Sequence, residues 1–405
     1  MSGHKKPRLL VLNQYYAPAY ESTAHLLAQL CEDLTSDFDV AVVTGMVRRS
    51  DVQAGVNVRR GVEVVRVRST AFDRRRLGLR ALNYVSYLLA SLSAALAQPR
   101  PDVVLCMTDP PIIANVALVV ARRFRAPLVV ISQDVFPEIA VELNRITNPL
   151  VIGLLRRAVR EYLRRADRVV AIGDRMKARL VEKGADPGRV TVIPNWTDTR
   201  FLEPQPHDNQ WARANGIAND FVVMHSGNVG HAQNLDAFVR AGSFLRDLER
   251  LSLVVVGSGA RLADLVDLGE MLEVESLRFL PYQPLEVLPE SLSAGDVHVV
   301  GLARGLAGYV VPSRLYGILS VGRPVIVAAE EGTETVDVVR AAECGIVVPP
   351  GRPELLAGAI RDAYDGKYDL EAMGARGRAF VVTEADRLVA VERYRRVLHD
   401  LLARR

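Results

Sequence analysis

Short runs of branched apolar residues alternate with longer amphipathic segments along almost the whole chain. Because parallel strands need long crossovers, this alternation predicts parallel sheets covered by helices on both faces. In the first half, the expected strands are residues 8–13, 40–44, 62–67, 103–107, 128–132, 168–172 and 190–193. In the second half, they are residues 222–226, 253–257, 277–280, 297–302, 325–328 and 345–348. The sequence therefore predicts an α/β protein of two doubly wound, Rossmann-like domains facing a central cleft, where the carboxyl ends of the strands bind ligands.

The domain boundaries follow from where this alternation stops. Residues 197–219 contain Pro204 and Pro206, show little periodicity and are predicted to be a linker. The last segment, residues 384–405, is helical in pattern and rich in Arg, Leu and Val. We therefore expect an N-terminal domain at 1–199, a C-terminal domain at 200–383 and a final helix at 384–405 that packs back on the N-terminal domain.

The composition is that of a folded globular chain, since 49% of the 405 residues are hydrophobic and 24% are charged. Cys31, Cys106 and Cys344 lie far apart in apolar patterns, so neither a disulfide framework nor a thiolate metal site is expected. No apolar run reaches the roughly 20 residues of a membrane-spanning helix, and the N-terminus lacks the layout of a cleavable signal. These features predict a cytoplasmic protein.

Basic residues outnumber acidic ones, and the formal net charge is +4. They cluster before an apolar helix at 77–97, with Arg74, Arg75, Arg76 and Arg80, and along a second helix, with Arg156, Arg157, Arg160, Arg164, Arg165 and Arg168. Arginine-rich helices with an apolar face can make peripheral contact with the inner face of an anionic membrane, although charge runs also occur as solvated faces. No nucleic-acid partner is expected, because no strand alternates aromatic and basic residues for base stacking.

Residues 311–328 join a basic, hydroxyl-bearing turn to a short helix, a glycine and a buried strand. Pro312 fixes the entry to the helix, Ser313 is expected to cap it, and Arg314 follows directly. A helix N-terminus beside an arginine favours an anion such as a diphosphate. The alternative is an ordinary turn with a solvated arginine.

A second turn follows the first strand of the second half and contains Gly227 and Gly230. Glycines there let the backbone approach a negatively charged ligand before the next helix opens, although a lone Gly-x-x-Gly is usually only a tight turn. With Arg314 on the same sheet edge, this turn predicts a nucleotide-activated ligand. A further glycine turn, residues 256–261, is interpreted as structural. Tyr282 follows a later strand and would lie against a nucleobase or simply pack.

The order of six motifs resembles that of the family 4 glycosyltransferases, which have the GT-B fold, use nucleotide sugars and retain the anomeric configuration. The motifs are Ile193–Asp198, Ser226–Gly230, Phe279–Pro281, Ala294–Asp296, Pro312–Tyr316 and Gly322–Ile326. Within the family, the chain is most similar to the fucosaminyltransferase-like branch, whose Asp-Leu-Trp-Pro-Glu segment is matched by Asp134–Glu138. The resemblance runs from about Leu9 to the C-terminus. It implies a polysaccharide-biosynthesis type of enzyme that moves a sugar from a nucleoside diphosphate sugar, expected to be a UDP-sugar, to a hydroxyl of a glycan, lipid-linked or secondary-metabolite acceptor.

The resemblance assigns donor-binding roles to matching residues. The family's glycine turn contacts the donor phosphates, which implies that role for Gly230 and His231. The lysine of its Pro-Ser-Lys segment corresponds to Arg314, which would neutralise the leaving diphosphate. Tyr309 stands at one of two positions where many members place a glutamate, so ribose recognition is expected to differ. The candidate donor residues are Gly227, Asn228, Gly230, His231, Leu280, Tyr282, Tyr309, Pro312, Ser313 and Arg314.

The resemblance also places acceptor-side residues in the N-terminal domain. The family's Pro-Glu and glycine-rich stretch corresponds to residues 17–23, with Tyr20, Glu21 and Ser22 as candidates; the acidic residue is shifted and the glycine is missing. Asp134 and Glu138 form a carboxylate pair at a strand end that would either line the acceptor side or cap the next helix.

Retaining transfer without a covalent nucleophile needs the acceptor hydroxyl on the same face as the leaving diphosphate, with positive charge near that phosphate. Arg314 and Asp109 are the catalytic candidates; Asp109 would position acceptor or sugar hydroxyls, with a plain turn aspartate as the alternative. If arginine and helix ends supply the positive charge, neither a metal nor a cofactor is expected besides the donor substrate.

Two other enzyme classes share the two-domain arrangement. A nucleotide-sugar 2-epimerase would need acid and base groups around the sugar C2 instead of an acceptor site, and it remains the alternative. A phosphorylase would need a lysine for pyridoxal phosphate, and the lysines beyond the N-terminus, Lys177, Lys183 and Lys367, lie in helical or loop positions that argue against it.

Overall fold

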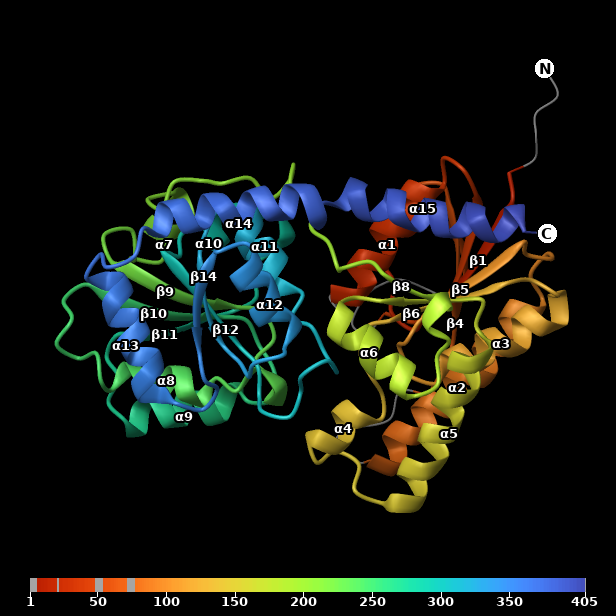
Figure 1. Ribbon diagram of the computed structural model, residues 1–405, viewed down its shortest axis with the longest axis horizontal. Helices are drawn as coiled ribbons and strands as arrows, with labels where there is room; N and C mark the ends of the chain where they lie inside the picture. Colours follow the sequence, from red (N-terminus) through yellow and green to blue (C-terminus); the bar gives the residue numbers. More distant parts are fainter. Residues whose placement is uncertain (1–5, 20–21, 48–53, 71–76, 405) are drawn as a thin grey trace. The chain divides into compact units, whose positions relative to one another are not determined.

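The computed structural model describes residues 6–19, 22–47, 54–70 and 77–404, which form two compact units (Figure 1). Unit 1 comprises the chain up to Pro194 together with the residues from Ala390 on, and unit 2 comprises Asn195–Val389. The polypeptide therefore passes between the units twice, once after Pro194 and once within its last helix.

Unit 1 is built on an 8-stranded sheet in the order β3-β4-β2-β1-β5-β6-β7-β8. Its strands are β1 (Arg8–Leu12), β2 (Asp39–Gly45), β3 (Gly55–Arg59), β4 (Val62–Val67), β5 (Val103–Met107), β6 (Leu128–Ser132), β7 (Arg168–Ala171) and β8 (Val190–Val192). All neighbours pair in parallel except β3, which is antiparallel to β4. β5 and β6 are buried along their whole length, which is the pattern of central strands covered on both faces.

The helices of unit 1 cover both faces of this sheet. They are α1 (Ser22–Leu34), α2 (Leu77–Leu96), α3 (Ile113–Phe124), α4 (Glu138–Glu142), α5 (Pro149–Arg165), α6 (Asp174–Glu182) and most of α15 (Arg387–Ala403), with a 3₁₀ turn at Pro187–Arg189. α3 packs against both α2 and α5, so these three form one layer, while α1 and α15 lie on the other face (Figure 1).

Unit 2 contains a 6-stranded, fully parallel sheet in the order β11-β10-β9-β12-β13-β14. The strands are β9 (Phe221–Ser226), β10 (Leu251–Val256), β11 (Leu277–Leu280), β12 (Val297–Gly301), β13 (Val325–Ala328) and β14 (Gly345–Val348). The helices are α7 (Gln210–Ala214), α8 (Asp236–Gly242), α9 (Leu262–Met271), α10 (Leu288–Ser293), α11 (Arg314–Ser320), α12 (Glu334–Ala341), α13 (Pro353–Tyr364) and α14 (Leu370–Glu384), with 3₁₀ turns at His231–Gln233 and Leu285–Val287.

Alternate residues of β9 enter different cores, as the two-residue period of a strand requires. Val223 joins a cluster with Phe238 of α8 and Ile360 of α13 on one face of the sheet. Met224 joins a cluster with Trp211 of α7 on the other face. Both faces of the strand are therefore buried, which confirms the doubly wound, Rossmann-like arrangement expected from the sequence.

The strands expected in both halves are found within one or two residues of their predicted ends, but β3 was not predicted. β3 is the edge strand, and Val56 and Val58 are 63% and 76% exposed. A strand that buries little apolar surface lacks the apolar run on which the sequence prediction depended.

The prediction that residues 197–219 form a linker is wrong. This segment carries α7, whose Trp211 is 6% exposed and lies in the core of unit 2 together with Ile217. The Trp211 indole donates a hydrogen bond to Gln283 (2.9 Å), and the Asn209 side chain caps α7 at the Ala212 amide (2.9 Å). Prolines and polar residues made this short helix resemble a connection.

Candidate active site

The topology of unit 2 predicts where a ligand binds. From β9 the chain moves outward to β10 and β11, and it then returns to place β12 on the other side of β9. In open α/β sheets, ligands bind at the carboxyl ends of the strands beside such a switch point. The segments that follow the carboxyl ends of β9 and β12 contain the candidate residues from Gly227 to His231 and from Tyr309 to Arg314.

Arg314 begins α11, and its guanidinium lies against the end of β9. The Arg314 Nη1 is 2.6 Å from the Nε2 of His225 and 3.2 Å from its Nδ1. His225 is fully buried, and its Nδ1 lies 3.3 Å from the carbonyl oxygen of Val299 on β12. A neutral imidazole with its proton on Nδ1 donates to Val299 and accepts from Arg314.

The electrostatics of the pair favour this assignment. Burial, and then the charge of Arg314, lower the pKa of His225 well below its usual value. Burial lowers the pKa of Arg314 to about 10, which still leaves the guanidinium charged at neutral pH. The pair therefore carries one positive charge, held in place by a neutral acceptor.

His225 was not among the candidate site residues predicted from the sequence. The signal that could have found it is a polar residue one position before the end of an otherwise apolar, buried strand, since such a group must find a hydrogen-bond partner.

The glycine turn after β9 packs tightly against the turn after β10. Gly227 has a φ of +136°, and a side chain there would meet the Arg314 Cζ at 3.4 Å. The Val229 amide donates to Ser258 (2.9 Å). A Cβ on Gly257 would lie 1.9 Å from the Gly227 oxygen, and one on Gly259 would lie 2.2 Å from the Val229 oxygen. Both glycines are therefore required for this close backbone approach.

The turn does not open directly into a long helix, as the sequence suggested. Gly230 is followed by one 3₁₀ turn, His231–Gln233, and α8 begins only at Asp236. The Gly230 amide donates to the side chain of Gln233 (3.0 Å), so it already has an acceptor in this structure. Asn228 and His231 are exposed beside the turn.

The expected cap of α11 is also absent. Ser313 itself has helical backbone angles (φ −62°, ψ −22°), and its side chain makes no capping hydrogen bond. An N-cap residue normally has extended angles that point its oxygen back to the first amides, so the helical conformation explains the loss. Pro312 is buried, Tyr309 and Leu280 are partly buried, and Tyr282 is 54% exposed near Arg314.

In unit 1, two candidate carboxylates come together at the carboxyl ends of neighbouring strands. Asp109 follows β5, and Asp134 follows β6. Burial, and the nearby charge of Asp109, raise the pKa of Asp134 to about 7. Near neutral pH Asp134 is therefore present in both its protonated and its ionised form, so its carboxyl group can both donate and accept hydrogen bonds.

Glu138 does not join that pair. It begins α4 and accepts hydrogen bonds from Arg156 (3.1 Å) and Lys183. Burial by itself would raise the pKa of Glu138, but the bonds from these two cations lower it. Ser22 begins α1, and Tyr20 and Glu21 lie outside the described residues.

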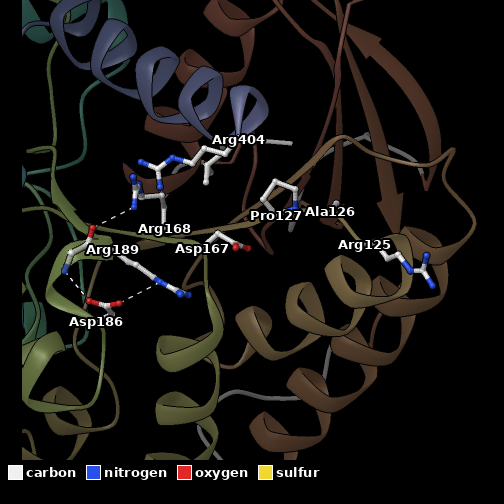
Figure 2. Close-up of a pocket in the computed structure, with 10 residues that line it drawn as sticks. Arg125, Ala126, Pro127, Asp167, Arg168, Asp186, Arg189 and Arg404 are labelled. Atoms are coloured by element: carbon white, nitrogen blue, oxygen red, sulfur yellow. Dashed lines mark hydrogen bonds and ion pairs between the residues drawn. The ribbon is translucent and has the colours of Figure 1, made fainter.

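A cavity of about 510 Å³ lies at the opposite edge of the unit 1 sheet (Figure 2). Residues at or just before the amino ends of β6, β7 and β8, including Pro127, Arg168 and Arg189, line it together with Arg404. Because α/β sheets bind ligands at their carboxyl ends, this cavity is not part of the candidate site.

Comparison with known proteins follows the division into two units. Residues 21–196 match the family model described as "Glycosyl transferase 4-like domain", and residues 208–380 match the one described as "Glycosyl transferases group 1". The chain belongs to the family 4 glycosyltransferases. "Probable glycosyltransferase WbjE" of Pseudomonas aeruginosa is 24% identical to this glycosyltransferase over 399 residues, 98% of each chain. WcaI of Escherichia coli strain K12, whose name assigns it to colanic acid biosynthesis, is 31% identical over 208 residues, which is 50% of this chain and 51% of WcaI.

The fold of the glycosyltransferase is also that of solved structures. HepE of Anabaena, crystallised in complex with UDP, superposes with a TM-score of 0.74 at 14% identity and covers 97% of this chain and 100% of HepE. The two Rossmann-like units are thus those of a GT-B enzyme. Within the described residues, no helix is both long and apolar enough to cross a bilayer.

Proposed function

We propose that this glycosyltransferase transfers a sugar from a nucleoside diphosphate sugar to an acceptor hydroxyl, with retention of the anomeric configuration and without a metal ion. The observation that carries the proposal is the Arg314 guanidinium, which is held by neutral His225 at the switch point of the unit 2 sheet and packs over Gly227. A fixed cation beside a glycine turn is suited to a pyrophosphate.

UDP is the proposed nucleotide. HepE, which shares the fold, has been crystallised with UDP and with UDP-glucose. Tyr282 stands exposed after β11 and near Arg314, where an aromatic ring can lie against a base. The donor residues proposed from the sequence thus lie at the carboxyl ends of β9, β11 and β12 or on the segments that follow them.

The chemical role of Arg314 follows from the charge that develops during transfer. As the glycosidic bond to the donor breaks, negative charge grows on the departing diphosphate. A preorganised cation stabilises that charge without having to reorient, and His225 supplies the preorganisation. The positive charge of Arg314 supports a reaction that proceeds without a divalent cation.

Asp109 and Asp134 are proposed to bind the acceptor or sugar hydroxyls in unit 1. A hydroxyl donates one hydrogen bond and accepts others, and protonated Asp134 as donor beside the Asp109 carboxylate as acceptor can satisfy both. The buried oxygens of the Asn13 and Gln14 side chains, at the end of neighbouring β1, have no hydrogen-bond partner among the described residues and could accept from further hydroxyls. The proposed acceptor is a glycan, lipid-linked intermediate or small secondary metabolite. Membership of the fucosaminyltransferase-like branch stays a prediction, supported by the Asp134–Glu138 segment.

The decisive experiment measures UDP binding by calorimetry. Arg314→Ala is expected to weaken binding by about 10- to 100-fold, because a charge-assisted hydrogen bond contributes roughly 1.5–3 kcal/mol. Arg240→Ala, which removes an exposed arginine on α8, is the control and should bind normally. Unchanged binding by Arg314→Ala would exclude the proposed donor site.

Two further measurements test the reaction type. The anomeric configuration of the product, determined by NMR, should match that of the donor, and turnover should persist in a chelator. Incubation of the donor without acceptor should leave its sugar unchanged, whereas a 2-epimerase would convert it.

A further inference from the structure

The layer formed by α2, α3 and α5 has an outer surface of unusual composition. Exposed aliphatic side chains come from all three helices: Leu82, Val85 and Leu89 of α2, Val119 of α3, and Leu150, Val151 and Leu154 of α5. Leu150, Leu154 and Leu89 are 78%, 70% and 64% exposed. We call this set the aliphatic patch.

The patch on α2 follows the helical repeat. Leu82, Val85 and Leu89 are spaced by three and four residues, so they share one face, while Tyr87 and Ser91 are buried on another. Residues 82–96 contain no charged side chain at all. A helix that both buries one face and exposes leucines on the other has apolar surface left to cover.

The charge on the same layer is strongly positive. α3 and α5, together with residues 82–96, contain seven arginines and a single glutamate, Glu161. Their formal charge of +6 exceeds the +4 of the whole chain, so the rest of the protein is net negative. Arg157, Arg160 and Arg164 of α5 are exposed.

We propose that the aliphatic patch and these arginines form a surface that docks on an anionic lipid bilayer. Inserted leucines would bury their side chains at the level of the acyl chains, and guanidinium groups would meet lipid phosphates. The charge complementarity selects an anionic membrane over a neutral one. This inference deepens the proposed function, because docking would bring unit 1 and its proposed hydroxyl-binding carboxyl groups to a lipid-linked acceptor.

The test is co-sedimentation of the full-length protein with vesicles of phosphatidylcholine mixed with phosphatidylglycerol, compared with phosphatidylcholine alone. Binding to the anionic vesicles, weakened by salt, is expected. Arg157→Gln combined with Arg160→Gln should lower the affinity for anionic vesicles about tenfold, because each arginine near an anionic surface raises that affinity several-fold. Leu150→Ser combined with Leu154→Ser should lower it by a similar factor.

Matched controls lie outside the layer. Arg200→Gln with Arg240→Gln removes two exposed arginines, and Met271→Ser with Leu355→Ser removes two exposed apolar side chains, all in unit 2. Both controls should bind vesicles like the unaltered protein. Equal binding to neutral vesicles, equal losses in the controls, or self-association through the patch in place of vesicle binding would overturn the proposal. Vesicle binding needs neither donor nor acceptor, so its failure is distinguishable from failure of the proposed transferase reaction.

Discussion

The contact between Arg314 and His225 joins residues 89 positions apart in the chain. The arginine was identified from its neighbours in sequence, whereas the histidine that orients it becomes visible only when β9 and α11 are brought together. The expected Ser313 cap failed for a related reason, because the helical backbone at that residue is set by its surroundings and not by its own propensity. Local motifs thus placed the candidate residues at the carboxyl edge of the sheet but did not reveal the contacts between them.

Replacing His225 tests whether it positions Arg314. His225→Ala should weaken UDP binding by roughly tenfold, because the guanidinium loses its acceptor and with it a hydrogen bond worth about 1–1.5 kcal/mol. His225→Asn, which keeps a side-chain acceptor, should recover part of the affinity. Calorimetric titration with UDP measures both, and equal losses in the two variants would show that the histidine is needed only for packing.

Gly259 is expected to tolerate no side chain. Gly259→Ala should lower stability by about 1–3 kcal/mol and weaken donor binding, because its Cβ would overlap the Val229 oxygen and push the glycine turn away from Arg314. Gly358→Ala is the matched control. Nothing lies within 4 Å of its Cβ in α13, and alanine there should raise stability by about 0.5–1 kcal/mol. Urea unfolding checks both changes.

Among the elements, those that bury apolar residues on two faces were predictable and those at the edges were not. The central strands are recognisable in the sequence as runs of Val, Leu and Ile, because a strand buried on both faces needs apolar residues at every position. β3 and α7 lack that signature: one is an exposed edge, and the other is held by Trp211 and side-chain hydrogen bonds. Sequence periodicity predicts elements that bury many apolar residues. It does not predict an element whose burial depends on a single residue.

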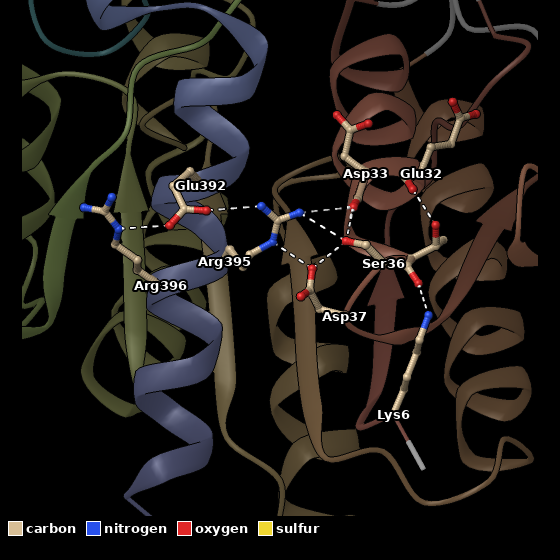
Figure 3. Close-up of polar contacts among 9 residues, drawn as sticks. Lys6, Glu32, Asp33, Ser36, Asp37, Glu392, Arg395 and Arg396 are labelled. Carbon is tan, nitrogen blue, oxygen red and sulfur yellow. Dashed lines mark hydrogen bonds and ion pairs between the residues drawn. The ribbon is translucent and has the colours of Figure 1, made fainter. Parts of the chain in front are cut away.

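Two kinds of contact attach α15 to unit 1, and they should differ in strength. Arg395 of α15 binds Asp37 (2.7 Å) and Ser36 (3.1 Å) after α1 (Figure 3), while Leu398 is fully buried. Leu398→Ala should cost about 2–5 kcal/mol through the cavity it leaves. Arg395→Ala should cost about 1 kcal/mol or less, because the ion pair is partly solvated. Denaturant unfolding measures both losses of stability. A larger loss for Arg395→Ala than for Leu398→Ala would contradict the prediction.

For the molecule as a whole, buried histidines link stability to pH. Burial lowers the pKa of His298 to about 4, so between pH 6.5 and 4 the unfolded chain binds a proton that the folded chain does not. The contribution of neutral His298 to the free energy of unfolding is therefore fully present above pH 6.5 and is lost as the pH falls toward 4. His225 acts in the same direction. His207, whose pKa is raised by its hydrogen bond to Asp296, acts in the opposite one.

The contribution of His298 can be isolated with His298→Gln. The difference in unfolding free energy between the unaltered protein and this variant should shrink as the pH falls from 6.5 toward 4, by roughly 1.4 kcal/mol for each unit of pKa shift. Groups such as Asp134, whose raised pKa adds stability at acid pH, cancel in the difference. A difference that stays constant with pH would show that His298 titrates normally in the folded state.

The last helix, α15, makes unit 1 discontinuous in the sequence. All eight strands of that sheet are complete by Val192, yet Leu398 and Leu401 of the unit lie more than 200 positions later. During synthesis, the first unit would therefore leave the ribosome with the face shared by α1 and α15 only partly covered, while the whole of the second unit is still being made. The second unit, being continuous, can fold first, and the N-terminal half is completed only once α15 has been translated.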